Sequence, residues 1–286
     1  ARARENQWGF VDFNRPMVAI NQWEQAADSM YTLCGKDRIH PSTDGHLVMA
    51  YLFLKAQGLA GKLVADIRID GAGKKVTRSD NCRVSDLSVS SDNLTFTYEA
   101  KSLPYPIDTS YYDNEKHTQA DALSVIPFMD EMNYEGLSVS GLSDGYYGLT
   151  IGGEFIGRFT ARELERGINM ALLQNTPQYK QAMKIRQMNE ERWLKERKMR
   201  EFYWVEYNLM RKTGMLWACN EAAVDTLRKY RPHDIFLQWN GDLWLQYMHK
   251  GIREDCVNEQ QDLVNQIYEQ NKPIPLRIEI KKFTDL

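Results

Sequence analysis

The sequence predicts an α/β segment followed by an α+β region that combines an antiparallel sheet with long helices. Residues 1–60 carry a short apolar run and two helical patterns, whereas residues 61–160 mostly alternate apolar and polar positions. Residues 161–286 contain a long stretch without Gly or Pro and end on one more alternating run. Because helices and strands repeat with different periods, we predict three parts: an α/β part, a β-rich accessory region, and a helical region with a terminal strand.

Composition places the chain among ordinary globular proteins. It has 286 residues, of which 43% are hydrophobic and 26% charged, and its net charge is -3. This length allows two domains and a sizeable core, and the charge gives no general attraction to nucleic acid. No apolar run approaches the length that spans a bilayer. The sequence alone leaves the compartment open.

The first 60 residues predict one strand and two helices. Gly9–Phe13 is an apolar run typical of a buried parallel strand, and residues 16–30 place apolar side chains on one helical face. A second helix is predicted from Asp44, as its N-cap, to about Ala56. One strand cannot form a sheet, so we expect other polypeptide to cover the apolar faces of these helices.

Strands are predicted between residues 63 and 159, as a mainly antiparallel sheet with one buried face. The alternation places four side chains on that face: Ile67, Phe96, Leu149 and Phe155. After Thr160, which begins a capping box with Glu163, helices dominate. One helix is expected to cover 178–212 and to be continuous for most of its length, and the run Leu276–Ile280 is expected to form a strand that could rejoin the sheet.

The loop Asp37-Arg38-Ile39-His40 is the stretch whose residues best suit a catalytic role. An Asp and a His three residues apart, in a loop before an apolar helix, suit a base and its orienting carboxylate. His40 would take a proton from a nucleophile, and Asp37 would fix its tautomer. The alternative is structural: Asp37 would cap local backbone amides beside an ordinary surface histidine.

This loop resembles the last conserved block of the SGNH (GDSL-like) hydrolases, including Pro41 and the Gly45-His46 that opens the next helix. The resemblance implies that Asp37 and His40 are triad residues and that residues 1–60 end a flavodoxin-like three-layer domain. The family's Ser block (G-D-S) and its Gly and Asn (G-x-N-D) blocks do not occur here. We therefore expect a truncated chain that lacks the N-terminal half of its hydrolase domain and is inactive alone.

Four later runs are similar to the C-terminal region of large bacterial SGNH proteins: Gly136–Leu142, Gly145–Ile151, Gly167–Ala171 and Asn175–Gln178. The resemblance implies a serine ester hydrolase that acts on O-acyl, above all O-acetyl, esters of carbohydrates, in the periplasm or outside the cell. The alternative is a non-catalytic scaffold, either a degenerate hydrolase or a carbohydrate-binding module. A weaker third hypothesis is an interaction protein that pairs through its long helix.

The cysteines and histidines predict no metal site and no cofactor. Cys34, Cys82, Cys219 and Cys256 are far apart and form no C-x-x-C pair. Two disulfides or four isolated thiols fit this spacing equally well. His46 is interpreted as a helix-start residue that packs against the Asp37–His40 loop.

Overall fold

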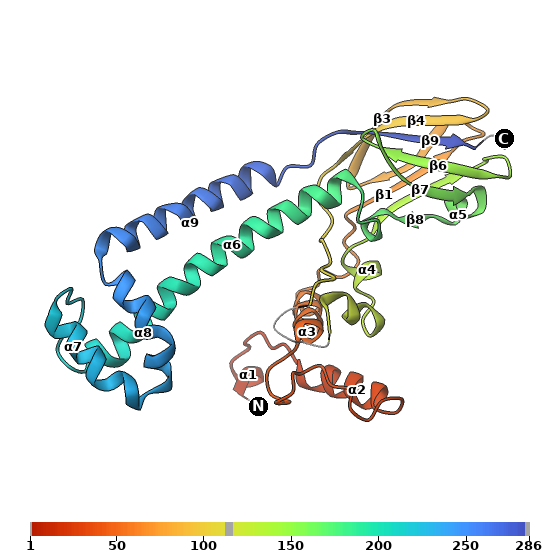
Figure 1. The fold of residues 1–286 in the computed structure, drawn as a ribbon. Coiled ribbons are helices and arrows are strands. Elements are labelled where there is room, and N and C mark those ends of the chain that lie inside the picture. Colours follow the sequence, from red (N-terminus) through yellow and green to blue (C-terminus); the bar gives the residue numbers. More distant parts are fainter. Residues whose placement is uncertain (1, 112–116, 284–286) are drawn as a thin grey trace. The chain divides into compact units, whose positions relative to one another are not determined.

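The computed structural model describes residues 2–111 and 117–283. The chain divides into two compact units, of which the first combines Ala1–Ala182 with Pro273–Leu286 and the second is Met183–Lys272. In sequence terms, the second unit is therefore an insertion into the first. Strands that form sheets are followed by a helical region, so the predicted fold class is confirmed (Figure 1). The predicted boundaries near residues 60 and 160 stay predictions.

The N-terminal part of the first unit consists of short helices around a small hydrophobic cluster. Leu33, Leu47, Val48 and Tyr51 bury their side chains there together with Phe128. The elements of this part are α1 (Arg2–Glu5), α2 (Asn14–Glu24), α3 (Thr43–Ala56), the 3-10 helix η1 (Gln119–Ser124) and α4 (Phe128–Glu131).

Two predictions for this part were wrong in detail. Gly9–Phe13 forms no strand, and the side chain of Phe10 is 74% exposed. A strand needs a neighbour that pairs with its backbone, and no strand in the described part of the chain pairs with this run. The helix predicted to reach Met30 ends at Glu24, because the chain turns over residues 25–27 and Gln25 then binds the carbonyl of Tyr31.

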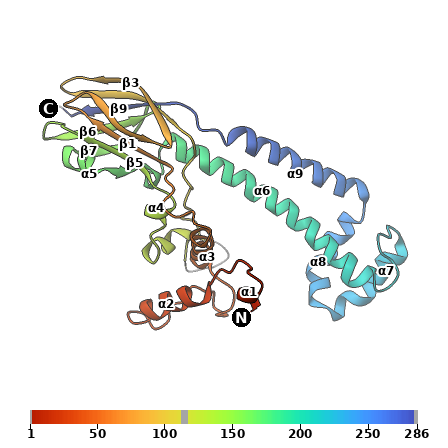
Figure 2. The same cartoon turned by 180° about the vertical axis from the view of Figure 1, so that it is seen from behind.

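The strands form two sheets rather than the single sheet predicted. The first sheet has the order β2-β1-β5-β8, and the second has the order β3-β4-β9-β6-β7 (Figures 1 and 2). The first consists of β1 (Ala65–Asp70), β2 (Lys75–Asp80), β5 (Glu135–Ser140) and β8 (Ile168–Asn169). The second consists of β3 (Cys82–Val89), β4 (Asn93–Ala100), β6 (Tyr146–Ile151), β7 (Glu154–Thr160) and β9 (Leu276–Lys282). Short helices follow: α5 (Ala161–Arg166) and η2 (Met170–Leu172).

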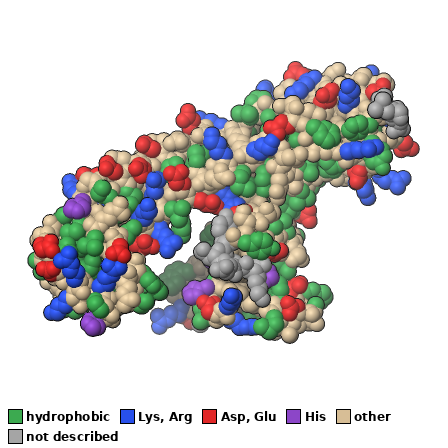
Figure 3. Space-filling model, viewed as in Figure 1, with side chains coloured by type: hydrophobic (Ala, Val, Ile, Leu, Met, Phe, Trp, Pro, Cys, Tyr) green, Lys and Arg blue, Asp and Glu red, His purple; other side chains and the backbone are tan. Residues whose placement is uncertain are grey.

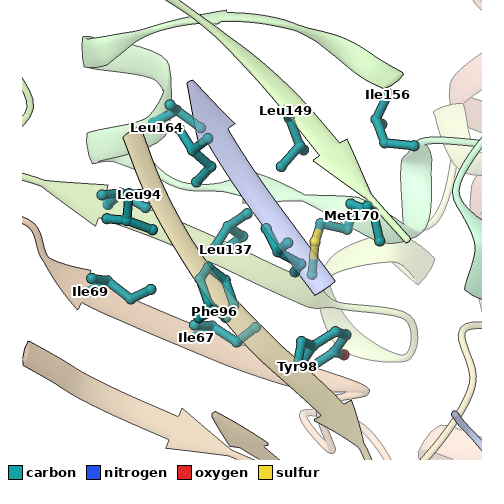
Figure 4. Packing of buried hydrophobic residues seen from close by; sticks show 14 of the residues in the cluster. Ile67, Ile69, Leu94, Phe96, Tyr98, Leu137, Leu149, Ile156, Leu164 and Met170 are labelled. Atoms are coloured by element: carbon teal, nitrogen blue, oxygen red, sulfur yellow. The ribbon is translucent and has the colours of Figure 1, made fainter. Parts of the chain in front are cut away.

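A shared core holds the two sheets together as a sandwich. Ile67, Ile69 and Leu137 from the first sheet face Phe96 and Leu149 from the second, and all are at most 1% exposed (Figure 4). Burying large apolar side chains of this kind contributes on the order of 2 kcal/mol each. Most pairs of neighbouring strands are antiparallel, as predicted, but β1 and β5 pair in parallel.

The predicted inward positions are correct for Ile67, Phe96 and Leu149 and wrong for Phe155. Phe155 is 59% exposed and packs edge-on against Phe283 on the outer surface, whereas Ile156 points into the core. The register of the β6–β7 pair shifts beside Leu149, and a one-residue shift moves a strand's side chains to the opposite face. The terminal strand rejoins the sheet as expected, since β9 pairs with β4 and β6.

The second unit is helical and has its own core, in which Phe202, Val205 and Trp244 are fully buried. The helix α6 (Pro177–Val205) is unbroken over its length, which confirms the predicted continuity past Arg200. From Glu206 to Met210 the backbone continues as a π-helix, η3, which the sequence did not predict. The remaining helices are α7 (Glu221–Tyr230), the 3-10 helix η4 (Arg231–His233), α8 (Ile235–Tyr247) and α9 (Lys250–Gln270).

Charged side chains of both signs are interspersed over the face that Figure 3 shows. Within residues 2–111 and 117–283, no helix is both long enough and apolar enough to cross a bilayer.

Candidate active site

The Asp37–His40 stretch is the tip of a narrow loop that closes on itself. An isolated β-bridge joins Cys34 to Pro41, and the amide of Gly35 donates to the carbonyl of His40 at 2.7 Å. Within the tip, Arg38 adopts a left-handed backbone with φ of +57°, which is uncommon for a residue other than glycine. These constraints fix the loop and bring residues 37 and 40 to the same side.

Asp37 and His40 are in direct contact. Nδ1 of His40 lies 2.5 Å from Oδ2 of Asp37, while Oδ1 of Asp37 accepts the amides of Ile39 and His40 at 2.9 and 3.1 Å. The hydrogen bond from His40 and these two backbone amides lower the pKa of Asp37 to about 2. The carboxylate therefore stays ionised at neutral pH, and it both caps the turn and orients the imidazole. Asp37 thus makes both contacts that the sequence suggests: it caps local backbone amides, and it contacts the imidazole of His40.

The imidazole of His40 points into solvent. Its side chain is 83% exposed, and within the described residues its Nε2 atom has no hydrogen-bond partner. A histidine held by its Nδ1 with a free Nε2 can exchange a proton with a group that approaches from outside. The predicted contact with Asp37 is present, but the described residues do not enclose His40 in the predicted cleft.

Residues at the start of α3 hydrogen-bond to the segment that precedes this loop. The carbonyl of Leu33 accepts both the amide and the hydroxyl of Ser42, at 3.0 and 3.1 Å. Gly45 lies so close to Leu33 that a Cβ at this position would be 2.0 Å from the Leu33 carbonyl oxygen. Only glycine fits here, which explains physically why the loop is followed by a glycine at this spacing.

Two predictions about this helix start were wrong. Ser42 is the N-cap residue of α3, and Asp44 lies inside the first turn with its carboxylate buried. Asp44 accepts hydrogen bonds from the Ser42 hydroxyl and from the Gly45 amide, so it holds the turn from within instead of capping it. His46 is exposed, because its position on the helix faces solvent and not the loop.

A second pairing of histidine and carboxylate, which sequence reasoning missed, lies at the same helix start. Nδ1 of His117 is 3.8 Å from Oδ2 of Asp44, and the His117 ring meets the edge of Tyr31. Burial of the Tyr31 hydroxyl, followed by the nearby Asp44 carboxylate, raises the pKa of Tyr31 to about 12. No local sequence pattern joins residues so far apart in the chain, so only the fold reveals this contact.

The segment around the loop exposes many large apolar side chains. None of the residues of α2 is buried. A shallow hollow of about 330 Å³ lies between α2 and η1 and is lined by Ile20, Trp23 and Val125 among others. Five large side chains within the first 40 residues are 65–80% exposed: Trp8, Phe10, Trp23, Met30 and Ile39. Apolar exposure of this extent is typical of a surface that packs against further polypeptide.

Comparison with known proteins adds two likenesses. Residues 183–272, which make up the second unit, match a family described as the diltiazem deacetylase C-terminal helical domain. The chain is also similar to the solved structure of a gut microbial diltiazem-metabolizing enzyme, with 42% sequence identity and a TM-score of 0.93. That likeness covers 98% of this chain and 64% of the other, so the chain spans a little less than two thirds of that enzyme's length. No curated protein matches the chain.

Proposed function

We propose that this chain is part of an ester hydrolase that removes acetyl groups, with His40 as its base and Asp37 as the residue that orients it. The single observation that carries the proposal is the contact between Nδ1 of His40 and Oδ2 of Asp37, which leaves Nε2 open to a reactant. The likeness to a diltiazem-metabolizing enzyme and to a deacetylase domain supports an ester as the substrate.

The proposed mechanism is that of a serine esterase. Nε2 of His40 takes the proton of a serine hydroxyl as the serine oxygen attacks the acetyl carbonyl carbon. The ester C–O bond then breaks, and the leaving alcohol takes the proton from His40. A water molecule attacks the acetyl-serine in the same way and releases acetate. Because Asp37 stays ionised, it stabilises the imidazolium that forms in both steps.

In this proposal the serine and the oxyanion donors belong to polypeptide outside the 286 residues, as the SGNH resemblance implies. The exposed apolar side chains around α2 would pack against that polypeptide. For the alcohol part of the substrate, the resemblance favours carbohydrates that carry O-acetyl groups. The similar enzyme is described as metabolizing diltiazem, and the matched family is named after a diltiazem deacetylase. The shared chemistry is the acetyl ester.

The test compares p-nitrophenyl acetate hydrolysis by the 286-residue chain and by a longer polypeptide of the same reading frame that carries a G-D-S block. We expect activity only in the longer protein, because a chain without the nucleophile keeps at most a small residual rate. His40→Ala should lower kcat by roughly 10³-fold or more, and Asp37→Asn by about 10²- to 10⁴-fold. The matched control is His46→Ala, which removes an exposed histidine six residues away and should change the rate less than twofold.

One observation favours a second candidate function, a non-catalytic scaffold. The side chain of His40 is 83% exposed, so the described residues do not enclose it. If the longer protein stays inactive on a panel of acetyl esters that includes acetylated sugars, the scaffold hypothesis replaces the esterase. If the 286-residue chain alone hydrolyses the ester and loses this activity in His40→Ala, the nucleophile lies within the chain.

A further inference from the structure

A thiol and an imidazole meet at the surface of the second unit. Sγ of Cys219 lies 3.4 Å from Nδ1 of His249, and both residues are exposed. Cys219 directly precedes Asn220, the N-cap of α7, and His249 is the N-cap of α9. A nucleophilic sulfur is thus in hydrogen-bond contact with a possible proton acceptor, outside the candidate active site.

One buried carboxylate connects the segments that carry the two side chains. Glu206 is only 1% exposed, and its Oε2 accepts the backbone amide of Trp217, two residues before Cys219, at 2.7 Å. Its Oε1 accepts the indole N–H of Trp244, in the helix that leads to His249, at 2.8 Å. Because both oxygens of Glu206 are engaged, the two segments are held at a fixed separation.

The local backbone also holds the pair in place. Nη1 of Arg253 donates to the carbonyls of Tyr247 and Met248, at 2.5 and 2.8 Å, and so fixes the turn before His249. The imidazole of His249 makes no capping bond to its own helix and contacts Cys219 instead. On the other side, Trp217 has a left-handed backbone with φ of +63°. Strained backbone of this kind often accompanies functional positions.

The π-helix η3 also lies next to the segments that carry Cys219 and His249, through Glu206. The backbone of α6 changes to η3 at Glu206, the residue that holds both segments. Such π segments are rare, and they are frequently found at functional sites. Glu206 therefore both begins the π-helix and links the segments that carry Cys219 and His249.

The other three cysteines have different surroundings. Burial raises the pKa of the Cys82 thiol to about 11. Cys256 is 4% exposed and donates to the carbonyl of Lys195 at 3.6 Å. Cys34 is half-buried and faces the carbonyl of Ile39. Within the described residues, only Cys219 is both exposed and in contact with an imidazole.

We propose that Cys219 is a site of thiol–disulfide exchange, with His249 as its base and a small-molecule disulfide such as oxidised glutathione as its reactant. Nδ1 of His249 takes the thiol proton as Sγ attacks one sulfur of the disulfide. A new S–S bond forms between Cys219 and that half of the reagent, and the old S–S bond breaks. The leaving thiolate takes the proton from His249, so one disulfide is exchanged for another.

The experiment treats the full 286-residue chain with oxidised glutathione and follows each cysteine by peptide mass mapping. We expect Cys219 to form the mixed disulfide at least about tenfold faster than Cys34, because only Cys219 has a base in contact. His249→Asn should slow the reaction of Cys219 by about tenfold and leave that of Cys34 unchanged, since an amide oxygen can accept a hydrogen bond from the S–H group but cannot take the proton. Asn is also a favourable N-cap residue, so this variant should keep α9 intact.

Two controls keep the result decisive. His233→Ala removes another exposed histidine of the same unit and should leave the rate at Cys219 unchanged. Far-UV circular dichroism of His249→Asn should match that of the parent chain. Equal rates at Cys219 and Cys34 would overturn the proposal, as would an unchanged rate at Cys219 in a folded His249→Asn chain.

Discussion

The Tyr98 hydroxyl donates to Oε1 of Glu135 at 2.8 Å, and both side chains lie inside the core of the sandwich. Gln178 donates to the same oxygen at 3.2 Å, whereas Oε2 of Glu135 is buried without a partner in the described part of the chain. Burial outweighs the two hydrogen bonds and raises the pKa of Glu135 from 4.5 to about 7. The folded protein therefore favours the protonated acid.

From this relationship we predict that stability falls as the pH rises. Below pH 4.5 the carboxyl is protonated in both states, so its contribution to stability is fully present. Between pH 4.5 and 7 the unfolded chain releases the proton and the folded chain keeps it, which costs on the order of 3 kcal/mol once the folded state also ionises. Glu135→Gln cannot ionise and should lose this dependence. Urea unfolding of both proteins at pH 5 and pH 8 measures the free energy of unfolding. The same change in this free energy between the two pH values in both proteins would contradict the prediction.

Gly45→Ala should destabilise the first unit by about 2 kcal/mol or more. The new methyl group would overlap the carbonyl oxygen of Leu33, which is backbone and cannot rotate away. The matched control is Gly251→Ala, in the exposed first turn of α9, where a Cβ meets nothing within 4 Å. That change should be neutral or stabilise by up to about 1 kcal/mol. Chemical denaturation of the two variants measures both effects.

The pKa of Asp37 should respond to its partner. We expect carboxyl NMR titration of the parent chain to give a value near 2, because the hydrogen bond from His40 is the largest influence on it. In His40→Ala the pKa should rise toward the ordinary 3.8, while the two backbone amides keep it from rising fully. An Asp37 that titrates identically in the two proteins would mean that the contact does not form in solution.

Glu206→Gln should weaken the second unit by about 1–3 kcal/mol. A glutamine side chain has one acceptor oxygen, so either the amide of Trp217 or the indole of Trp244 would lose its buried partner. Glu254→Gln serves as the control, since that carboxylate is exposed and pairs only with Lys250 in the described structure. It should change the midpoint of thermal unfolding by little. Similar losses in both variants would argue against the role assigned to Glu206.

The sequence predicts local features of this fold well. Pro177 at the start of α6, and the absence of Gly or Pro until Gly214, are enough to indicate the long helix. The contact of Asp37 with His40 also follows from spacing, because a tight loop brings residues three apart together. The alternation of Leu276–Ile280 predicts the strand that the structure confirms.

Other features depend on contacts that no local pattern records. The parallel pairing of β1 with β5 joins two segments that are separated in the sequence by β2, β3 and β4, so periodicity cannot reveal it. Alternation predicts which residues of β7 share a face and so places Phe155 inward, but the register shift beside Leu149 decides which face points to the core. His117 beside Asp44, and His249 beside Cys219, are likewise brought together by tertiary packing alone.

The place of β9 has a consequence for the order in which the protein is made. In the described residues, β9 follows every other strand in the sequence and lies between β4 and β6, so the five-stranded sheet stays in two pieces until residues 276–282 leave the ribosome. The helical insertion, by contrast, is complete in the sequence before β9 is synthesised. While the helical unit is already complete in a nascent chain, the edges of β4 and β6 that β9 will occupy are still open, and they can pair wrongly until β9 arrives.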